Sequence, residues 1–427
     1  MKLQRLAFLS VFVLAATGLV CWLLGEPVGR WFAEHFGAAI TRASSDEIID
    51  VSGFVTGLVW DGMRLFTAGL SLAWVHVLLS RAMMPHLGRN ARWAFQAVLI
   101  FILGNLLLAA AFRTTLFWCA LFQGYDAGEN YCPFQVKEHI LKGAKADLKI
   151  AIMGNSQANR QLKRQLLNKV FGPRVLTEDL HWPGSRAYDM LLVHRRMAPD
   201  EAQLILCYVS EGFFYSPSSG EAVPQFFSFS DLSDQGRLGI FSRLPPRKIW
   251  YGLLGDLMPA FRARDPLAQR IMGTEMFGIR QRAVNAGLGV ESETQARRVA
   301  RSMACNSCSD FEKQAFELFV EQCARRNQKI VLIAGQLNPV LGGILPPEMR
   351  ADMLRFLRSI AQRYPNVTLI DNPPFQESSE YVDLTHVTAQ RRDAFTRYMA
   401  AKLVELGLVP APQGSSGESL KLQGAKP

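Results

Sequence analysis

The chain has few of the features that mark several protein classes. Charged side chains make up only 20% of its 427 residues, whereas 49% of the residues are hydrophobic, so a wholly disordered protein is excluded. Seven cysteines are too few at this length for a disulfide framework, and glycine does not recur at every third position as in collagen. At about 150 residues per domain, the length allows two to three domains.

Acidic residues are the scarcer of the two charge types. The chain has 37 Asp and Glu against 47 Lys and Arg, a formal net charge of +10, and its isoelectric point is near 9.4. This balance favours an anionic partner, and it leaves nucleic acid, a membrane surface and an acidic polymer open.

Three apolar runs in the first 120 residues are candidates for transmembrane helices. Residues 6–25 are almost uncharged and have the length of a membrane span, and no small-residue cleavage site follows them, so we expect a retained anchor. Residues 93–111 form a second span. Residues 65–80 form a third, weaker one that must extend back through residues 51–60. We therefore expect a membrane region over residues 1–120.

The distribution of basic residues predicts the topology of these spans. Lys2 and Arg5 precede the first span, and the 81–93 loop carries three arginines and no acidic residue, which is typical of cytoplasmic segments. The 25–50 loop holds five acidic residues against two arginines. Three crossings of the cytoplasmic (inner) membrane then place everything after about residue 120 outside the cytoplasm, in the periplasm or beyond.

From residue 147 onward, short apolar runs alternate with amphipathic stretches, a pattern typical of parallel strands joined by crossover helices. We expect a three-layer α/β domain over residues 147–406. Strands are predicted at residues 149–153, 174–177, 203–209, 329–334 and 367–371, and helices at 157–170, 187–197, 311–326, 350–363 and 389–406.

An insertion of roughly 95 residues interrupts this alternation at about residues 212–308, and it is too long for a plain loop. Its first half is rich in aromatic residues. These residues either form a lid over a cleft or pack into a satellite core. After about residue 410 the tail has no apolar periodicity, and we expect residues 410–427 to be disordered.

Two short segments carry the candidate chemistry. Ser156 follows the first predicted strand in the segment Gly154-Asn155-Ser156-Gln157, where it serves either as a helix cap or as a nucleophile at the carboxyl edge of the sheet. Asp383 and His386 lie between the last strand and the last helix. Their spacing lets the carboxylate orient the imidazole, which then acts as the base toward Ser156.

A serine directly after the first strand, a DxxH segment before the final helix and α/β alternation between them resemble the SGNH (GDSL-like) hydrolase superfamily. Within it, the chain resembles the membrane-anchored branch that holds the D-alanyl transfer protein DltD and the alginate O-acetylation proteins. The resemblance implies Ser156 as nucleophile, His386 as general base and Asp383 as its orienting carboxylate. It also implies an oxyanion hole that includes Gly184.

The chain departs from this family at one block. The family uses an asparagine from a GxND block after the third strand, and this chain has Ser210-Glu211-Gly212 at that position. Asn338, or Gln336 beside it, is the candidate substitute. The departure disfavours a standard esterase and leaves a weak site or a transfer-specialised site open.

No cofactor and no metal are expected. Cys305 and Cys308 form a single CxxC without a second cysteine pair or a nearby pair of histidines, so a closed zinc site is disfavoured. Outside the cytoplasm these two cysteines can instead form a short disulfide, the alternative being two unconnected thiols. Cys132, Cys207 and Cys323 need partners or burial.

Two classes of function compete. In the first, Ser156 accepts an acyl group of the D-alanyl or O-acetyl type and passes it to an anionic envelope polymer or a lipid-linked acceptor. In the second, the domain is an SGNH esterase or thioesterase, or a catalytically silent membrane scaffold of an envelope-modification complex. In the first class a multispan membrane acyltransferase is the expected partner, and nucleic acid is not.

Overall fold

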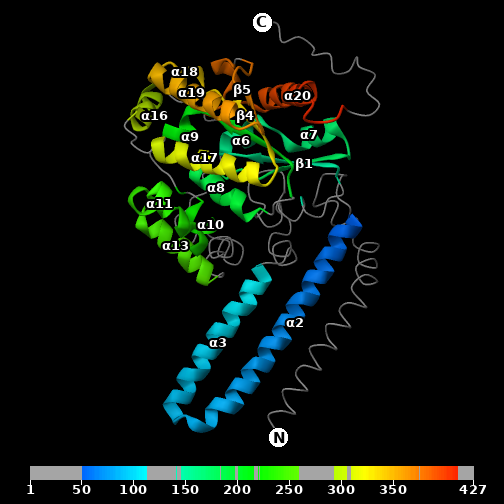
Figure 1. Cartoon of the computed structure of the whole chain (residues 1–427), viewed down its shortest axis with the longest axis vertical. Helices are drawn as coiled ribbons and strands as arrows, with labels where there is room; N and C mark the ends of the chain where they lie inside the picture. Colours follow the sequence, from blue (N-terminus) through cyan, green and yellow to red (C-terminus); the bar gives the residue numbers. More distant parts are fainter. Residues whose placement is uncertain are drawn as a thin grey trace. The chain divides into compact units, whose positions relative to one another are not determined.

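The computed structural model describes residues 51–112, 141, 146–182, 184–197, 201–215, 220, 222–258, 293–304, 309–374 and 376–411. The chain divides into two compact units (Figure 1). Unit 1 comprises Met1–Gly143 and Leu254–Ile279, and unit 2 comprises Ala144–Leu253 and Arg280–Pro427. The expected span at residues 6–25, the Cys305 and Cys308 pair, Cys132 and the tail after residue 411 lie outside the described residues.

Unit 1 contains a hairpin of two long helices, α2 (Val51–Met83) and α3 (Arg89–Phe112), which lie side by side in Figure 1. The 3-10 turn η1 (Met84–His86), with a proline in its first turn, separates them. Two of the expected apolar runs are therefore helical. By length and composition, one helix among the described residues qualifies as a membrane span, over Arg89–Leu107.

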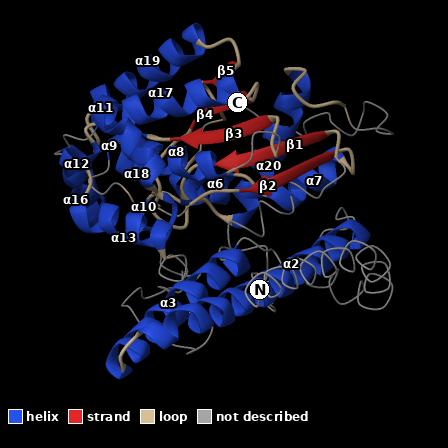
Figure 2. Ribbon diagram, turned by 60° about the horizontal axis from the view of Figure 1, so that its bottom comes forward, coloured by secondary structure: helices blue, strands red, loops and turns tan. Residues whose placement is uncertain are grey.

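Unit 2 is built on a five-stranded sheet in which every strand pairs with its neighbours in parallel, so the expected α/β class is confirmed (Figure 2). The order is β2-β1-β3-β4-β5. The chain adds β2 on one side of β1 and the later strands on the other side. Ligands in open parallel sheets bind at such a reversal of strand order, which here lies at β1 and β3. The strands are β1 (Leu148–Met153), β2 (Val175–Asp179), β3 (Leu204–Val209), β4 (Lys329–Ala334) and β5 (Val367–Ile370).

Helices cover both faces of this sheet (Figure 2). On one face, side chains such as Ile152 and Leu206 share a buried cluster with α6 (Ser156–Gln161), α7 (Arg164–Phe171) and α20 (Ala389–Glu405). Neighbouring strand residues point to the opposite face, where Cys207 contacts Met190 of α8 (Ala187–Arg196). On that face lie also α17 (Ser309–Arg325) and α19 (Pro347–Arg363). Cys207 and Cys323 are buried free thiols.

The expectation of one helix over residues 157–170 is wrong, because the chain breaks between α6 and α7 at Leu162 and Lys163. Neither residue is a helix breaker. The backbone amide of Lys163 donates to Oγ1 of Thr396 on α20 at 3.0 Å, and Leu162 is fully buried in the core. A tertiary contact therefore replaces a helical hydrogen bond and directs α7 along the sheet.

Among the described residues of the insertion, short helices pack against α8 and α17. The aromatic residues at its start pack into the core: Phe213 and Phe214 are fully buried and contact the Phe316 ring of α17 edge-on. For these residues the satellite-core alternative is confirmed. The segments are α9 (Glu211–Tyr215), α10 (Val223–Phe226), η2 (Phe229–Asp234), α11 (Gln235–Leu238), α12 (Ile240–Arg243), α13 (Pro246–Leu257) and α16 (Glu293–Ala304).

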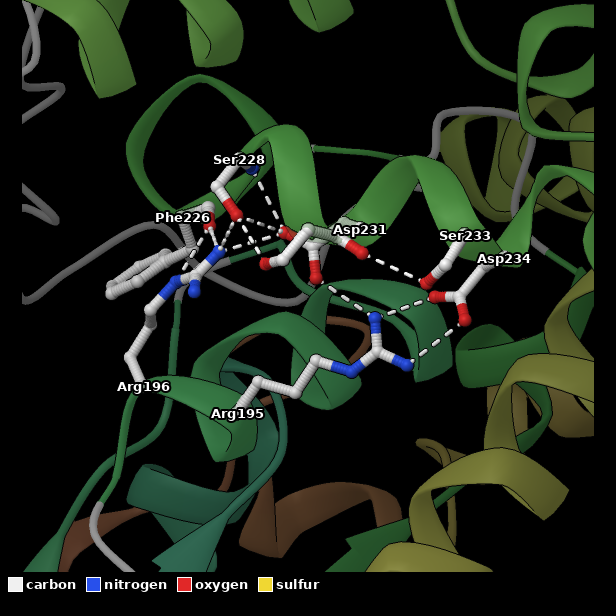
Figure 3. A network of polar contacts seen from close by, with 8 residues as sticks. Arg195, Arg196, Phe226, Ser228, Asp231, Ser233 and Asp234 are labelled. Carbon is white, nitrogen blue, oxygen red and sulfur yellow. Dashed lines mark hydrogen bonds and ion pairs between the residues drawn. The ribbon is translucent and has the colours of Figure 1, made fainter.

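Two neighbouring arginines of α8 attach this insertion to the sheet domain, as Figure 3 shows. Arg195 pairs with Asp231 at 2.8 Å and with Asp234 at 2.5 Å. Arg196 donates to the Phe226 carbonyl oxygen and pairs with Asp231 at 2.7 Å. Because the Asp231 side chain is only 1% exposed, removing its partners would leave a buried charge.

Candidate active site

The nucleophile candidate follows a backbone turn that only glycine accommodates well. Gly154, directly after β1, has φ +138, and a Cβ there would lie 3.1 Å from the Ala158 Cβ and 3.3 Å from the Tyr208 carbonyl oxygen. Asn155 caps α6 by accepting a hydrogen bond from the Gln157 amide at 3.0 Å. Asn155 is therefore the side-chain cap, and Ser156, the first residue of α6, keeps its partly exposed hydroxyl for another partner.

The loop between β5 and α20 orients the histidine. Oδ1 of Asp383 accepts hydrogen bonds from the backbone amides of Thr385 and His386, each at 2.7 Å. These bonds fix the carboxylate, and its second oxygen, Oδ2, lies 2.7 Å from Nδ1 of His386. The short DxxH spacing thus places carboxylate and imidazole in one local turn.

The two segments meet at the carboxyl edge of the sheet, where Nε2 of His386 lies 2.9 Å from Oγ of Ser156. Ser156, His386 and Asp383 therefore form one hydrogen-bonded chain. The side chains of His386 and Asp383 are 22% and 24% exposed, so the chain is shielded from bulk water and still open to a substrate.

The electrostatics of this chain favour an ionised carboxylate. Partial burial alone raises the pKa of Asp383, but the hydrogen bond and charge interaction with His386 and the two backbone amides outweigh burial and lower that pKa to about 2. A carboxylate that stays ionised holds the proton of the imidazole on Nδ1, which leaves Nε2 to accept a proton from Ser156.

Gln157 connects the two segments through its buried side chain. Its Oε1 accepts a hydrogen bond from the Ser210 hydroxyl at 2.5 Å, and its Nε2 donates to the Thr385 carbonyl oxygen at 3.5 Å. Gln157 is 4% exposed and Ser210, at the end of β3, is fully buried. We infer that Gln157 is a positioning residue that holds the DxxH loop beside α6, a role that sequence analysis missed.

Gly184, the expected oxyanion residue, lies in an exposed turn after β2 with φ +70. Two hydrogen bonds tie this turn to the carbonyl oxygen of Gly154, one from the Ser185 hydroxyl at 2.8 Å and one from the Trp182 amide at 3.0 Å. The structure thus brings the Gly184 turn against the loop that precedes Ser156. Its part in an oxyanion hole stays a prediction.

Asn338, the expected substitute for the missing asparagine, has other hydrogen-bond partners. It is 1% exposed, its Oδ1 accepts from the Val340 amide, and its Nδ2 donates to the Asp383 carbonyl oxygen at 3.0 Å. Gln336 likewise bonds the backbone of the segment before the DxxH loop, at Pro373 and Gln376. Within the described chain, no hydrogen bond joins either side chain to Ser156. The hydrogen bonds of Asn338 and Gln336 instead indicate that both side chains support the DxxH loop.

A second Asp-His pair lies at the same edge of the sheet, where β2 ends. Nδ1 of His181 lies 2.7 Å from Oδ1 of Asp179, and Asn159 of α6 bonds the other carboxylate oxygen. The His181 side chain is only 2% exposed, and it makes no hydrogen bond to Ser156 in the described structure. This pair braces α6 against β2. The DxH spacing after a predicted strand was the signal that could have revealed it.

No protein-family model and no curated protein matches this chain. The interpretation of the site therefore depends on its geometry. Among the residues that the structure describes, no group of three or more His, Cys, Asp or Glu side chains is placed to hold a metal ion.

Proposed function

We propose that this protein is an SGNH-type serine acyltransferase that modifies a cell-envelope polymer outside the cytoplasm. The observation that carries the proposal is the continuous chain from Oγ of Ser156 through the His386 imidazole to the Asp383 carboxylate, with links of 2.9 and 2.7 Å. This arrangement activates a serine hydroxyl for attack on an acyl carbonyl. The acyl group is of the D-alanyl or O-acetyl type.

In the first half-reaction, Nε2 of His386 accepts the proton of Ser156 as Oγ forms a bond to the acyl carbon of the donor. The bond from that carbon to the donor's leaving group breaks, and His386 returns the proton to the leaving group. The product is an acyl ester on Ser156. Asp383 stays ionised throughout and stabilises the transient imidazolium.

In the second half-reaction, an alcohol group of the acceptor takes the place of the leaving group. His386 accepts the alcohol's proton while the alcohol oxygen attacks the acyl carbon, and the proton then passes to Oγ of Ser156 as the enzyme ester breaks. The same chemistry with water gives hydrolysis. Transfer therefore requires that the acceptor compete with water for the acyl enzyme.

The departure from the family at the end of β3 supports a specialised site. Ser210 uses its hydroxyl to hold Gln157, and the buried carboxylate of Glu211 pairs with Arg350 of α19 at 3.1 Å. Neither side chain supplies the amide donor that the family's asparagine provides. In our proposal the Ser156 amide and the turn at Gly184 stabilise the oxyanion.

We place the protein in the cytoplasmic membrane, with unit 2 in the periplasm or outside. The apolar helix α3 and the basic turn before it support this location. After residue 119 the chain has 38 Lys and Arg against 31 Asp and Glu, a balance suited to an anionic acceptor. Because activated acyl donors are made in the cytoplasm, a multispan membrane acyltransferase is the proposed partner that delivers the acyl group.

Envelope acylation in cells that carry only the Ser156→Ala protein tests the catalytic role. The proposal predicts that this variant accumulates normally and that acylation is lost, whereas Ser302→Ala, a change of an exposed serine on α16, leaves acylation intact. Normal acylation with Ser156→Ala would exclude catalysis and favour the scaffold alternative. Purified protein that releases acyl groups to water at the same rate with and without acceptor would favour the esterase alternative.

A reporter fusion tests the location separately. Alkaline phosphatase joined to the carboxyl terminus should be active, because the enzyme folds outside the cytoplasm. Activity only from a cytoplasmic reporter at the same position would overturn the topology.

A further inference from the structure

The turn between α2 and α3 forms a hollow that the acyl-transfer site does not use. Its volume is about 480 Å³, and it is lined by residues of η1, of the connecting segment and of the first two turns of α3. The lining includes two guanidinium groups, one indole ring and one amide, and the complete set is Met84, Leu87, Gly88, Arg89, Arg92, Trp93 and Gln96.

The polar side of this hollow is positively charged. The chain from residue 81 to 96 contains three arginines and no Asp or Glu. Arg92 places its Nε 2.7 Å from the Leu87 carbonyl oxygen, which holds the guanidinium at the turn. Within the described structure Arg89 forms no ion pair, and both arginines are exposed. A bound phosphate group would supply the missing negative charge.

The hollow continues into an apolar surface along α3. Trp93, Ile100 and Phe101 share one face of the helix by their spacing, and they are 69%, 60% and 57% exposed. From Trp93 to Phe101 the helix rises about 12 Å, close to the hydrocarbon thickness of one leaflet. A ligand that fits both parts has an anionic head and long apolar chains.

We propose that the α2–α3 turn is a binding site for an anionic phospholipid. The phosphate is bound by Arg89 and Arg92, and the acyl chains lie along the Trp93 face of α3. The proposal depends on the proposed membrane location and is independent of catalysis at Ser156. The site anchors this turn at the cytoplasmic leaflet, where anionic lipids attract basic segments.

The test uses the full-length protein in detergent, mixed with phosphatidylglycerol, phosphatidylcholine or inorganic phosphate, with bound lipid measured by native mass spectrometry. We expect retention of phosphatidylglycerol over phosphatidylcholine. The variant Arg89→Gln/Arg92→Gln should weaken phosphatidylglycerol binding about tenfold or more. The matched control Arg298→Gln/Arg301→Gln removes the same charge from the exposed face of α16 and should change nothing.

Three results would overturn the proposal: equal retention of the two lipids, equal loss in the control variant, or displacement of the lipid by inorganic phosphate alone. Helical circular dichroism checks that the double variant is folded. If it is not, Arg89→Gln alone serves as the test, because its side chain makes no hydrogen bond in the described structure. The Ser156→Ala protein should bind phosphatidylglycerol like wild type, which separates this proposal from acyl transfer.

Discussion

Oγ of Ser156 and Nε2 of His386 lie 2.9 Å apart, although 230 positions separate the two residues in the sequence. One lies at the start of the first helix after β1, and the other precedes the last helix of the domain. The parallel sheet brings them together because the carboxyl ends of its strands share one edge.

Replacing Asp383 with asparagine should lower acyl-transfer turnover by roughly 10³–10⁴-fold, because the amide no longer holds the His386 imidazole in the tautomer that accepts the serine proton. Single-turnover kinetics with an ester donor measures the loss. The control is Asp371→Asn, since Asp371 forms a partly exposed pair with Arg358 and should leave turnover unchanged. A loss below tenfold in Asp383→Asn would contradict the orienting role.

The lowered pKa of Asp383 predicts that the folded protein loses stability at acid pH. Its pKa is about 2 in the folded protein, below its value of about 3.9 in an unfolded chain, so its ionised form stabilises the fold above about pH 4. That contribution is lost as the pH falls from about 4 to about 2. Urea unfolding across this window should show wild type losing stability relative to Asp383→Asn. If the unfolding free energies of the two proteins changed with pH in parallel, the pKa shift would be contradicted.

Glu312 of α17 predicts the opposite pH dependence of stability, a loss as the pH rises. Burial, together with nearby Asp189, raises its pKa to about 8, so the folded state holds a proton that the unfolded chain releases near pH 4.3. The stabilisation is complete below about pH 4 and is lost as the pH rises to about 8. Glu312→Gln keeps an oxygen for the Tyr188 amide. It should flatten this decline in stability when measured by thermal unfolding from pH 5 to 9, and an unchanged slope would contradict the shift.

Loss of the Gln157 side chain should impair catalysis without unfolding the domain. Gln157→Ala frees the DxxH loop from α6, and we expect kcat to fall about 10–100-fold with little change in KM, as for a loss of positioning. Gln390→Ala, an exposed change at the start of α20, is the control. If kcat stayed within twofold of wild type, the bridge to Ser210 and Thr385 would have no catalytic role.

The attachment of the insertion is expected to depend on buried charge. Arg195→Met leaves Asp234 without its partner and weakens the network around Asp231, so it should cost about 3–5 kcal/mol of unfolding free energy. Arg237→Met, which removes a more exposed pair with Glu321, should cost less than about 1 kcal/mol. If both variants lost the same unfolding free energy in urea, burial of the charges would not determine the cost.

The sequence predicted the parts of the site that depend on short spacing and on strand ends. Asp383 and His386 are three residues apart, and Ser156 follows a clear apolar strand, so pattern alone located all three. The five strands could be predicted because each is a short apolar run. The α/β class followed from their alternation with amphipathic helices.

The parts that sequence missed depend on contacts between distant elements. The Gln157 bond to Ser210 exists because β3 lies beside β1, and strand order cannot be read from a local pattern. The break at Lys163 depends on Thr396, and the pairing of Arg195 with Asp231 depends on how the insertion folds back. The sequence favours Asn338 only by its residue type, and its burial beneath the Asp383 loop depends on the tertiary structure.

The most direct test of the central claim is covalent labelling of the purified protein with a fluorophosphonate, followed by mass spectrometry of the peptide that contains Ser156. The account predicts one adduct, on Ser156, in wild type and in Ser302→Ala. It predicts no adduct in Ser156→Ala and much slower labelling in His386→Ala. Wild type that stays unlabelled, or Ser156→Ala that labels at the wild-type rate, would contradict a serine nucleophile activated by His386.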